Sequence, residues 1–316
     1  MTSQLQSHTL APKRERSRTD ADRRTGRARV AWWAIALLVP ALAFFVLFDY
    51  YPLVRVVTLS FQSTDLFGRP SGFIGFENYA DMFSSPQFLS TLTTTFLFAV
   101  GSVTLKLVCG LAIALPMSSS RRAGWLARPV VLIPMAVSVA VAGLVFRALF
   151  QPGFGLADQI LASIGLSSPG WLTNPDFALI SVIIVDTWVG IGFTVLILLA
   201  ALAGVPQEVR EAAAIDGAGP VRTGISIVMP LISSSILFLV IYHTVGALRE
   251  FTVINVLTQG GPADSTRTLV IDIWNLAFGS SGGNFGDASA RAIVLLVVVG
   301  IVSFIQFRVS NKKVHY

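Results

Sequence analysis

Residues 205–220 read VPQEVREAAAIDGAGP and lie between two long apolar runs. Pro206 suits the first position of a helix, and the glutamates that follow it, including Glu211, place negative charge near the positive end of the helix dipole. The three alanines after Glu211 have the highest helix propensity and leave a thin face that another protein can approach closely. Gly217 and the Gly-Pro pair after it predict the end of the helix. We interpret this short helix as a docking element on the aqueous side of a membrane protein.

The composition of the chain is that of an integral membrane protein. Of its 316 residues, 53% are hydrophobic and only 13% are charged, and the mean hydropathy is +0.71. A soluble domain carries about 25% charged residues. The net charge of +6 does not predict nucleic-acid binding, because the basic residues lie at loop ends and in the N-terminal tail. Cys109 is the only cysteine, so no disulfide can form within the chain.

The first 30 residues form a hydrophilic tail with almost no apolar content, which we expect to be disordered and cytoplasmic. The uncharged run Ala31–Phe48 comes next and is long enough to span a bilayer. A cleaved signal peptide is the competing interpretation, since Ala41-Leu42-Ala43 imitates a cleavage site. The apolar residues that continue the run beyond this site favour a retained helix. The eight basic residues of the tail are Lys13, Arg14, Arg16, Arg18, Arg23, Arg24, Arg27 and Arg29.

Five further apolar runs complete a predicted fold that is all-α, polytopic and built from six transmembrane helices in one domain, residues 31–316. Each of these runs has about 20 residues or more, the length that spans a bilayer as a helix. The runs are Phe88–Pro116, Val130–Phe150, Phe177–Ala203, Ile225–Leu248 and Ala288–Phe307.

Basic residues predict the orientation of these spans. Six spans place both termini on the same side, and 16 of the 23 Lys and Arg residues lie in the tail, in the second-to-third loop, in the 205–230 loop or at the C-terminus. Lys and Arg accumulate on the cytoplasmic side of membrane proteins. We therefore expect both termini and the docking helix to face the cytoplasm.

The spacing of the docking stretch resembles a family signature. Glu211-Ala212-Ala213, three residues, Gly217, nine residues, Ile227, one residue and Met229-Pro230 are similar to the EAA loop of bacterial ABC importer permeases, with Met229 in place of leucine. The chain also has Gly224 and Ser234 where sugar permeases of this type usually have Phe and Pro, which leaves the detailed geometry of the loop in doubt. An ordinary cytoplasmic loop helix is the competing interpretation.

Three other segments resemble the carbohydrate importers within that family. They are FIGFENY at residues 73–79, LTQGGP at 257–262 with Ser265-Thr266 after it, and GDASA at 286–290. The second is typical of the first permease of each pair, the maltose- and glycerol-phosphate-like one. Further stretches at 150–156, 213–220 and the C-terminus are most similar to glycerol-3-phosphate permeases. A non-sugar importer with the same fold stays open.

The resemblance implies a permease (MetI-like) fold in the bacterial cytoplasmic membrane, surrounded by lipid. It also implies three kinds of partner: a second homologous permease, two copies of an ATPase subunit and an extracytoplasmic solute-binding protein. The best guess for the solute is glycerol-3-phosphate or glycerophosphodiesters, and the alternative is a trehalose- or maltose-type di- or oligosaccharide. The residues that the resemblance assigns to ATPase docking are Glu211, Ala212, Ala213, Asp216 and Gly217.

Ionisable and aromatic residues inside the spans are candidates for the solute path, because a charge in lipid is costly. For each there is a structural alternative: a snorkelling or paired lysine, a core tryptophan beside a hydrogen-bonded aspartate, or an Arg–Glu pair at a span end. Arg147 and Arg291 we interpret as anchors at span ends. The path candidates are Lys106, Asp186, Trp188, His243, Arg249, Glu250 and Asn255.

The chain lacks the motifs of an enzyme. None of its four lysines follows a glycine, so a phosphate-binding loop is absent from the sequence. Its three histidines are too scattered for a zinc site, and we find no catalytic constellation or metal site. We expect ATP and Mg²⁺ on the partner subunits and no cofactor on this chain. An ion-coupled secondary transporter, a membrane enzyme and a structural scaffold are the alternatives from other classes, and none of them explains the docking loop.

Overall fold

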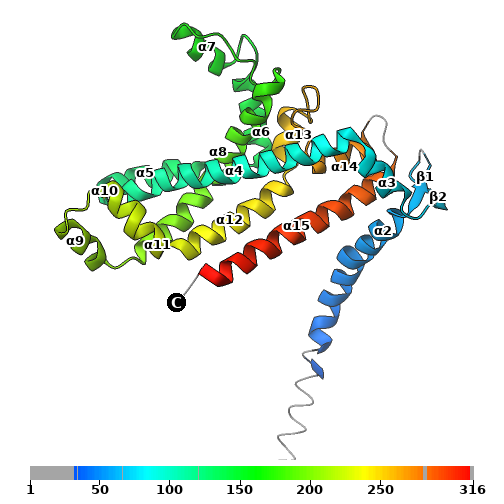
Figure 1. Cartoon of the computed structure of the whole chain (residues 1–316), viewed down its shortest axis with the longest axis horizontal. Coiled ribbons are helices and arrows are strands. Elements are labelled where there is room, and N and C mark those ends of the chain that lie inside the picture. The colour runs from blue at the N-terminus through cyan, green and yellow to red at the C-terminus, as the bar shows by residue number, and fades with distance from the viewer. Residues whose placement is uncertain (1–31, 34, 66, 120, 280–282, 314–316) are drawn as a thin grey trace, which may run out of the picture. The chain divides into compact units, whose positions relative to one another are not determined.

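The computed structural model describes residues 32–33, 35–65, 67–119, 121–279 and 283–313 (Figure 1). The predicted tail, residues 1–30, and its boundary with the membrane domain lie outside these residues. The chain divides into two compact units, Met1–Arg55 and Val56–Tyr316, which are described separately here.

An apolar helix with no buried side chains begins in the first unit and continues past the boundary at Arg55. The candidate span runs over Ile35–Leu59 and includes a π-helical turn, η1 (Val46–Tyr50), before α2 (Tyr51–Leu59). None of its most apolar window is buried within the chain. A helix that is apolar all round suits a lipid or protein environment rather than water. The first predicted span is therefore confirmed as a helix of sufficient length.

Three further helices of the second unit are long and apolar enough to span a membrane without interruption. They are α4 (Pro86–Ser119), α8 (Pro175–Ala203) and α15 (Phe285–Lys313). Two more candidate spans are bent helix pairs, so the described residues hold four straight candidates, or up to six if each pair counts as one span. The predicted helical membrane fold is confirmed, and two of its six predicted spans are bent helix pairs in the described residues.

The first bent pair is α5 (Arg121–Ala136) with α6 (Val139–Leu149), which meet at 106°. Pro134 lies in the last turn of α5 and cannot donate a backbone hydrogen bond, while Ser138 has extended backbone angles (φ −60°, ψ 135°). Proline is the common cause of a sharp kink in a helix. The apolar run Val130–Phe150 therefore changes direction near its middle.

The second bent pair also has a proline near its break. Pro230 lies in α11 (Met229–Leu231), and the helix resumes as α12 (Ser233–Leu248) after a bend of 76°. A π-helical segment, η2 (Thr223–Val228), and the short α10 (Pro220–Arg222) precede it.

Short elements occupy the connections between the spans. The one strand pair of the described residues, β1 (Gln62–Thr64) with β2 (Pro70–Phe73), is antiparallel and is the only departure from an all-helical fold there. The sequence did not predict this hairpin. The short helices are α3 (Glu77–Ser84), α7 (Leu156–Ser163), α9 (Gln207–Ile215), α13 (Thr252–Leu257) and α14 (Leu269–Phe278).

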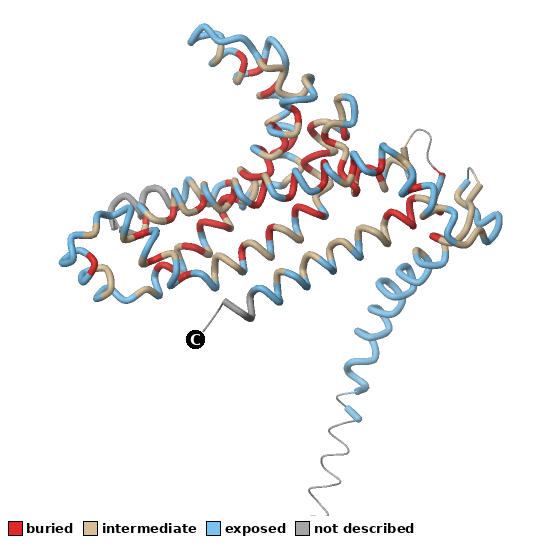
Figure 2. Tube along the Cα trace, viewed as in Figure 1, coloured by how far each residue is buried: buried red, intermediate tan, exposed pale blue. Residues whose placement is uncertain are grey.

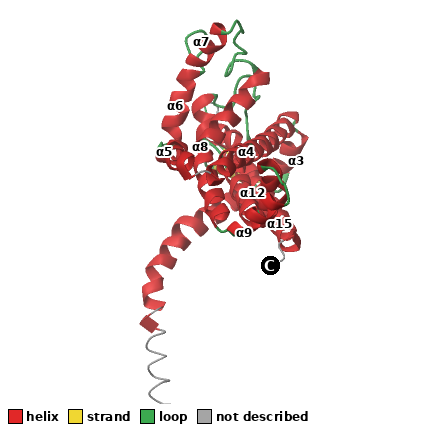
Figure 3. Cartoon of the chain, turned by 90° about the vertical axis from the view of Figure 1, so that its left-hand side faces the viewer, coloured by secondary structure: helices red, strands yellow, loops and turns green. Residues whose placement is uncertain are grey.

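The packed core of the second unit lies between α4, α8 and α12. Figure 2 shows buried residues along these helices, while much of the outer surface of the unit is exposed. Phe98 of α4 and Val185 of α8 belong to one cluster of buried side chains, and Leu198 of α8 and Leu239 of α12 belong to another. The end-on view in Figure 3 shows α4, α12 and α15 gathered in one bundle, with α6 and α7 to one side of it.

Candidate functional site

The predicted docking helix is α9, and it ends where the sequence indicated. The helix begins at Gln207, one residue later than predicted, because Pro206 is its N-cap rather than its first residue. Asp216 is its C-cap. Gly217 follows with φ +73°, a conformation that favours glycine. The N–H of Ala218 donates to the carbonyl of Ala213 at 2.9 Å and that of Gly217 to Ala214 at 3.1 Å. These two bonds form a Schellman motif, which satisfies carbonyls at the helix end.

Four of the five predicted docking residues are accessible on this helix. Glu211, Ala212, Asp216 and Gly217 are exposed, whereas Ala213 is buried against its own chain. The Nε2 of Gln207 donates to Oε1 of Glu211 at 2.7 Å, one turn away. This bond holds the Glu211 carboxylate in place on the exposed face, where a basic group could meet it.

Arg210 anchors α9 to the membrane domain, a role that we did not predict. Its Nη2 donates to the carbonyl of Leu202 at 2.9 Å, in the last turn of α8, where carbonyls have no partner within the helix. A cavity of about 1160 Å³ opens at this corner, and Ser118 at the end of α4 lines it together with Glu211. The feature of the sequence that could have indicated this anchor is an arginine near the start of the predicted docking helix, close to the end of an apolar run.

A buried ion pair joins α4 to α8 inside the membrane domain. The Nζ of Lys106 lies 2.7 Å from Oδ2 of Asp186, and both side chains are 6% exposed. The hydroxyl of Ser102 donates to the same oxygen. Pairing and hydrogen bonding are what allow charges to lie in a low-dielectric interior. Lys106 thus has its partner within the chain.

The ion pair lines a cavity of about 760 Å³ between α8 and α12. Five of the seven path candidates contribute to it: Lys106, Asp186, His243, Arg249 and Glu250. Three aromatic side chains complete one wall, namely Phe193, Phe238 and Tyr242, and the Phe193 and Tyr242 rings are 4.6 Å apart between centroids.

The polar groups around this cavity differ in how they are held. The Nε2 of buried His243 lies 2.9 Å from the hydroxyl of Thr194 on α8. Oε1 of Glu250 accepts a bond from the N–H of Val253 at 2.8 Å, near the start of α13. Arg249 is the C-cap of α12 and is exposed, and no ion pair joins it to another described residue. The Arg249–Glu250 pair that we considered is therefore absent from the described part of the chain.

Two path candidates lie outside the cavity. Trp188 packs edge-on against Phe146 of α6, with 5.2 Å between ring centroids. Asn255 is half-buried on α13. For Trp188 the contact with α6 matches the core role that we weighed against solute stacking.

The Lys106 side chain passes close to the backbone of α8 at Gly190, where no side chain blocks it. A Cβ atom at Gly190 would lie 2.7 Å from Cε of Lys106, whereas one at Gly246, across the same cavity, would meet nothing within 4 Å. We expect Gly190→Ala to destabilise the protein by about 1–3 kcal/mol through overpacking. Thermal unfolding in detergent measures this, with Gly246→Ala as the matched control. Equal unfolding temperatures for the two variants would contradict the proposed contact.

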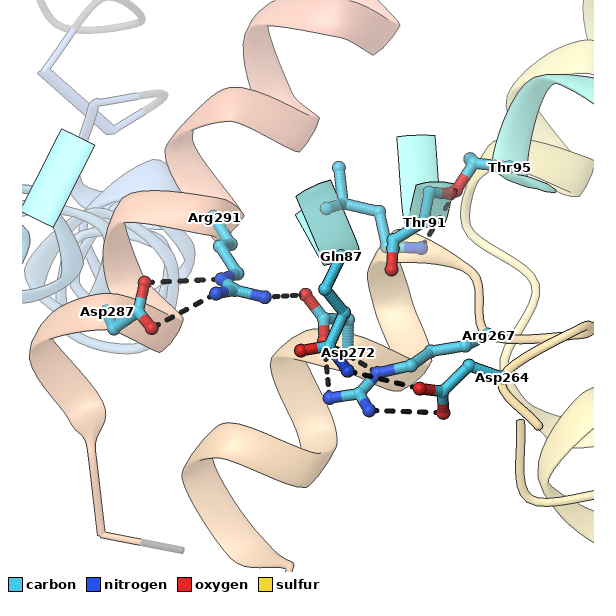
Figure 4. Close-up of polar contacts among 9 residues, drawn as sticks. Gln87, Thr91, Thr95, Asp264, Arg267, Asp272, Asp287 and Arg291 are labelled. Atoms are coloured by element: carbon cyan, nitrogen blue, oxygen red, sulfur yellow. Dashed lines mark hydrogen bonds and ion pairs between the residues drawn. The ribbon is translucent and has the colours of Figure 1, made fainter. Parts of the chain in front are cut away.

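A second polar cluster lies where α14 meets the start of α15 (Figure 4). Asp272 is fully buried and contacts two guanidinium groups, that of Arg267 at 2.7 Å and that of Arg291. Arg291 also pairs with Asp287 at 3.2 Å, one turn earlier on α15. Arg291 lies near the start of α15, where a span end was predicted, and its side chain is only 10% exposed and held between two carboxylates.

The same cluster is fastened to α4. Asp264 pairs with Arg267 at 3.3 Å and accepts a bond from Nε2 of Gln87 at 3.1 Å. The hydroxyl oxygen of Thr95 accepts a bond from the N–H of Leu269 at 2.9 Å, so α4 supplies the cap of α14. Arg147, the other predicted anchor, reaches the carbonyl of Val256 at 3.3 Å.

Comparison with known proteins gives the same fold. A family model described as "Binding-protein-dependent transport system inner membrane component" matches residues 106–316. The sn-glycerol-3-phosphate transport system permease protein UgpA of Pectobacterium atrosepticum is 33% identical over 91% of this chain and 97% of its own length. The sulfoquinovosyl glycerol transport system permease protein SmoG of Agrobacterium fabrum is 34% identical over 89% of this chain and 91% of its own.

A solved structure supports the fold independently of these sequences. A chain of a bacterial ABC transporter involved in the import of the acidic polysaccharide alginate superimposes with a TM-score of 0.79 at 22% identity. The match covers 92% of this chain and 99% of that one.

Proposed function

The chain belongs to the family of binding-protein-dependent transport system inner membrane components, and we propose that it is the permease subunit of an ATP-driven importer for an anionic, carbohydrate-type solute. It is a non-catalytic transport subunit of a multi-pass, inner-membrane type. Glycerol-3-phosphate or a glycerophosphodiester is the solute that we favour.

The observation that carries this proposal is an arginine without an ion pair in the cavity between α8 and α12. Lys106 is neutralised by Asp186, and the Glu250 carboxylate accepts a bond from the N–H of Val253. Arg249 is therefore the one Lys or Arg side chain of the described cavity lining that no ion pair holds. A guanidinium group binds phosphate with two parallel hydrogen bonds. An anionic solute group at Arg249 would place its glycerol or sugar hydroxyls toward the polar groups deeper in the cavity.

The relatives support an anionic solute. Their names specify glycerol-3-phosphate in one case and sulfoquinovosyl glycerol in the other. A glycerol unit and an acidic group, phosphate in one and sulfonate in the other, are common to both molecules. A site with one unpaired arginine suits either of them.

The docking helix supplies the energy coupling in this proposal. Glu211 on exposed α9 pairs with a basic group of an ATPase subunit, and two such ATPases hold the ATP and Mg²⁺. A second permease completes the path, and an extracytoplasmic binding protein delivers the solute. Both termini of this chain lie in the cytoplasm. Family membership favours this importer over an ion-coupled carrier.

A di- or oligosaccharide is the second candidate solute. Phe193, Phe238 and Tyr242 line one wall of the cavity, and the Phe238 and Tyr242 rings are stacked with 6.0 Å between centroids. Aromatic faces of this kind suit the apolar face of a sugar ring. Trehalose and maltose are therefore the compounds to compare.

The deciding experiment is ATP-dependent uptake by the reconstituted transporter. Glycerol-3-phosphate and glycerophosphodiesters are compared with trehalose and maltose, in wild type and in Arg249→Gln. We expect the variant to require roughly 10- to 100-fold more glycerol-3-phosphate for half-maximal uptake, because a hydrogen bond to a charged group contributes about 1.5–3 kcal/mol. Arg69→Gln, in the exposed hairpin turn, is the control and leaves uptake unchanged.

The outcomes separate the two solutes and the mechanism. Uptake of the phosphate compounds that is insensitive to Arg249→Gln contradicts the anion site. Uptake of trehalose or maltose alone assigns the aromatic wall as the solute contact. Uptake without ATP rejects the importer mechanism altogether.

A further inference from the structure

The connection between α6 and α8 contains a helix with three distinct faces. On α7, Ala157, Asp158 and Leu161 face the protein and are buried or half-buried. Figures 1 and 3 both show α7 at the far end of α6, to the side of the bundle. The other two faces of the helix are therefore open.

Asp158 fixes this helix with its carboxylate turned inward. One oxygen accepts from the N–H of Gly153 at 2.8 Å and the other from Nε1 of Trp171 at 3.0 Å. The Trp171 ring stacks on Phe150 at the end of α6, with 5.2 Å between centroids. The Ser168 hydroxyl and the Gly153 N–H both favour the ionised carboxylate, which lowers the pKa of Asp158. The segment is thus held in one arrangement by polar contacts on its inner side.

The outer side of the same segment is apolar. Leu156, Ile160 and Ile164 are spaced four apart, which places them on one face, and they are 53%, 57% and 65% exposed. Gln159 and Ser163, also four apart, form an exposed polar edge next to that face. Polar groups point inward or sideways here, and large apolar groups point outward, the reverse of a water-soluble helix.

The position of the segment in the chain favours lipid as the cover of this face. It joins α6, the second helix of a bent candidate span, to α8, an uninterrupted one. With both runs crossing the membrane as predicted, the two ends of the segment emerge on the same side. Leu144 and Val145 of α6 are also more than half exposed, so the apolar surface of the span continues toward α7. Asp158 is the only ionisable side chain between α6 and α8.

We propose that α7 lies in the interface of the outer leaflet, with Leu156, Ile160 and Ile164 inserted among phospholipid chains and Gln159 and Ser163 facing the headgroups and water. An amphipathic helix in this position reaches about 5–10 Å into the boundary between headgroups and acyl chains. The absence of cationic side chains makes apolar insertion, rather than attraction to anionic lipid, the source of binding. The helix would hold the outer end of α6 at a fixed depth.

Lipid quenching tests this placement in the full chain. Cys109→Ala removes the only cysteine. A fluorescent label is then attached at Ile160→Cys or, as the matched control on the polar edge about 100° round the helix, at Gln159→Cys. The variants are reconstituted in phosphatidylcholine vesicles, with and without the partner subunits. We expect a nitroxide near the top of the acyl chain to quench the label at 160 at least about twofold more strongly than the label at 159. Aqueous iodide should show the opposite order.

Two results would overturn the proposal. Equal quenching by iodide and by lipid at both positions means that α7 lies in water. A label at 160 that is shielded from lipid only when the partner subunits are present means that a protein covers the face instead. Neither readout requires transport, so failure here is separate from failure of the proposed function.

Discussion

Replacing Asp272 with leucine is expected to lower the free energy of unfolding by about 3–5 kcal/mol, the cost of removing one partner from a buried ion pair. Asp272 is fully buried, and Arg267 and Arg291 contact it from two sides. Without it, two guanidinium groups face each other with little access to solvent. The measurements are thermal unfolding in detergent and the yield of folded protein.

Two further variants serve as a control and as a rescue for this prediction. Asp264→Asn removes the outer carboxylate of the same cluster, which is 51% exposed, and should change stability by no more than about 1 kcal/mol. Adding Arg291→Met to Asp272→Leu removes one of the two guanidinium charges that face each other. The double variant should recover part of the lost free energy of unfolding. Equal changes in the free energy of unfolding for Asp272→Leu and Asp264→Asn would show that the buried carboxylate stabilises the protein no more than the exposed one.

Reversing the charge of Glu211 is expected to reduce ATP-dependent uptake to background while leaving the chain folded. The side chain is exposed, and its one side-chain hydrogen bond among the described residues is with Gln207, so we expect little effect on stability. A lysine there repels the basic group that we propose on the ATPase. Disrupting a charge pair at an interface costs about 2–5 kcal/mol of binding free energy, which is enough to weaken the coupling between the ATPase and the permease strongly. ATPase activity stimulated by the binding protein measures the same coupling.

Glu208→Lys is the matched control for this variant. Glu208 lies in the first turn of the same helix and is also exposed, so its reversal affects the helix dipole by about 0.3–1 kcal/mol only. The expected pattern is loss of coupling in Glu211→Lys and near-normal coupling in Glu208→Lys. If Glu211→Lys transports normally, α9 does not dock an ATPase through this residue.

Local chemistry allowed the spans and the docking helix to be predicted from the sequence. Apolar runs of sufficient length identify membrane helices whatever they pack against. The limits of α9 follow from Pro206 and Gly217, whose backbone preferences act within a few residues. The bends after Pro134 and Pro230 had a visible signal in those prolines, but a proline does not determine the angle.

The polar contacts could be predicted only as separate candidates. Lys106 and Asp186 are 80 residues apart, and nothing in either run specifies that they pair. The Asp272 cluster left weak local signals, since Asp264 precedes Arg267 by three residues and Asp287 precedes Arg291 by four. Its central carboxylate lies in an apolar segment, where a buried aspartate demands a partner. The aspartate in this apolar segment was therefore the feature of the sequence that could have predicted the cluster.

The length of α4 has a mechanical consequence. Its 34 residues make a rod of about 50 Å at 1.5 Å per residue. Gln87 and Thr95 bind the outer cluster at one end, and Ser118 borders the cavities beside Arg210 and Ala214 at the other. A movement of the docking helix that shifts the Ser118 end of α4 would therefore also shift Gln87 and Thr95, which hold the polar cluster at the other end.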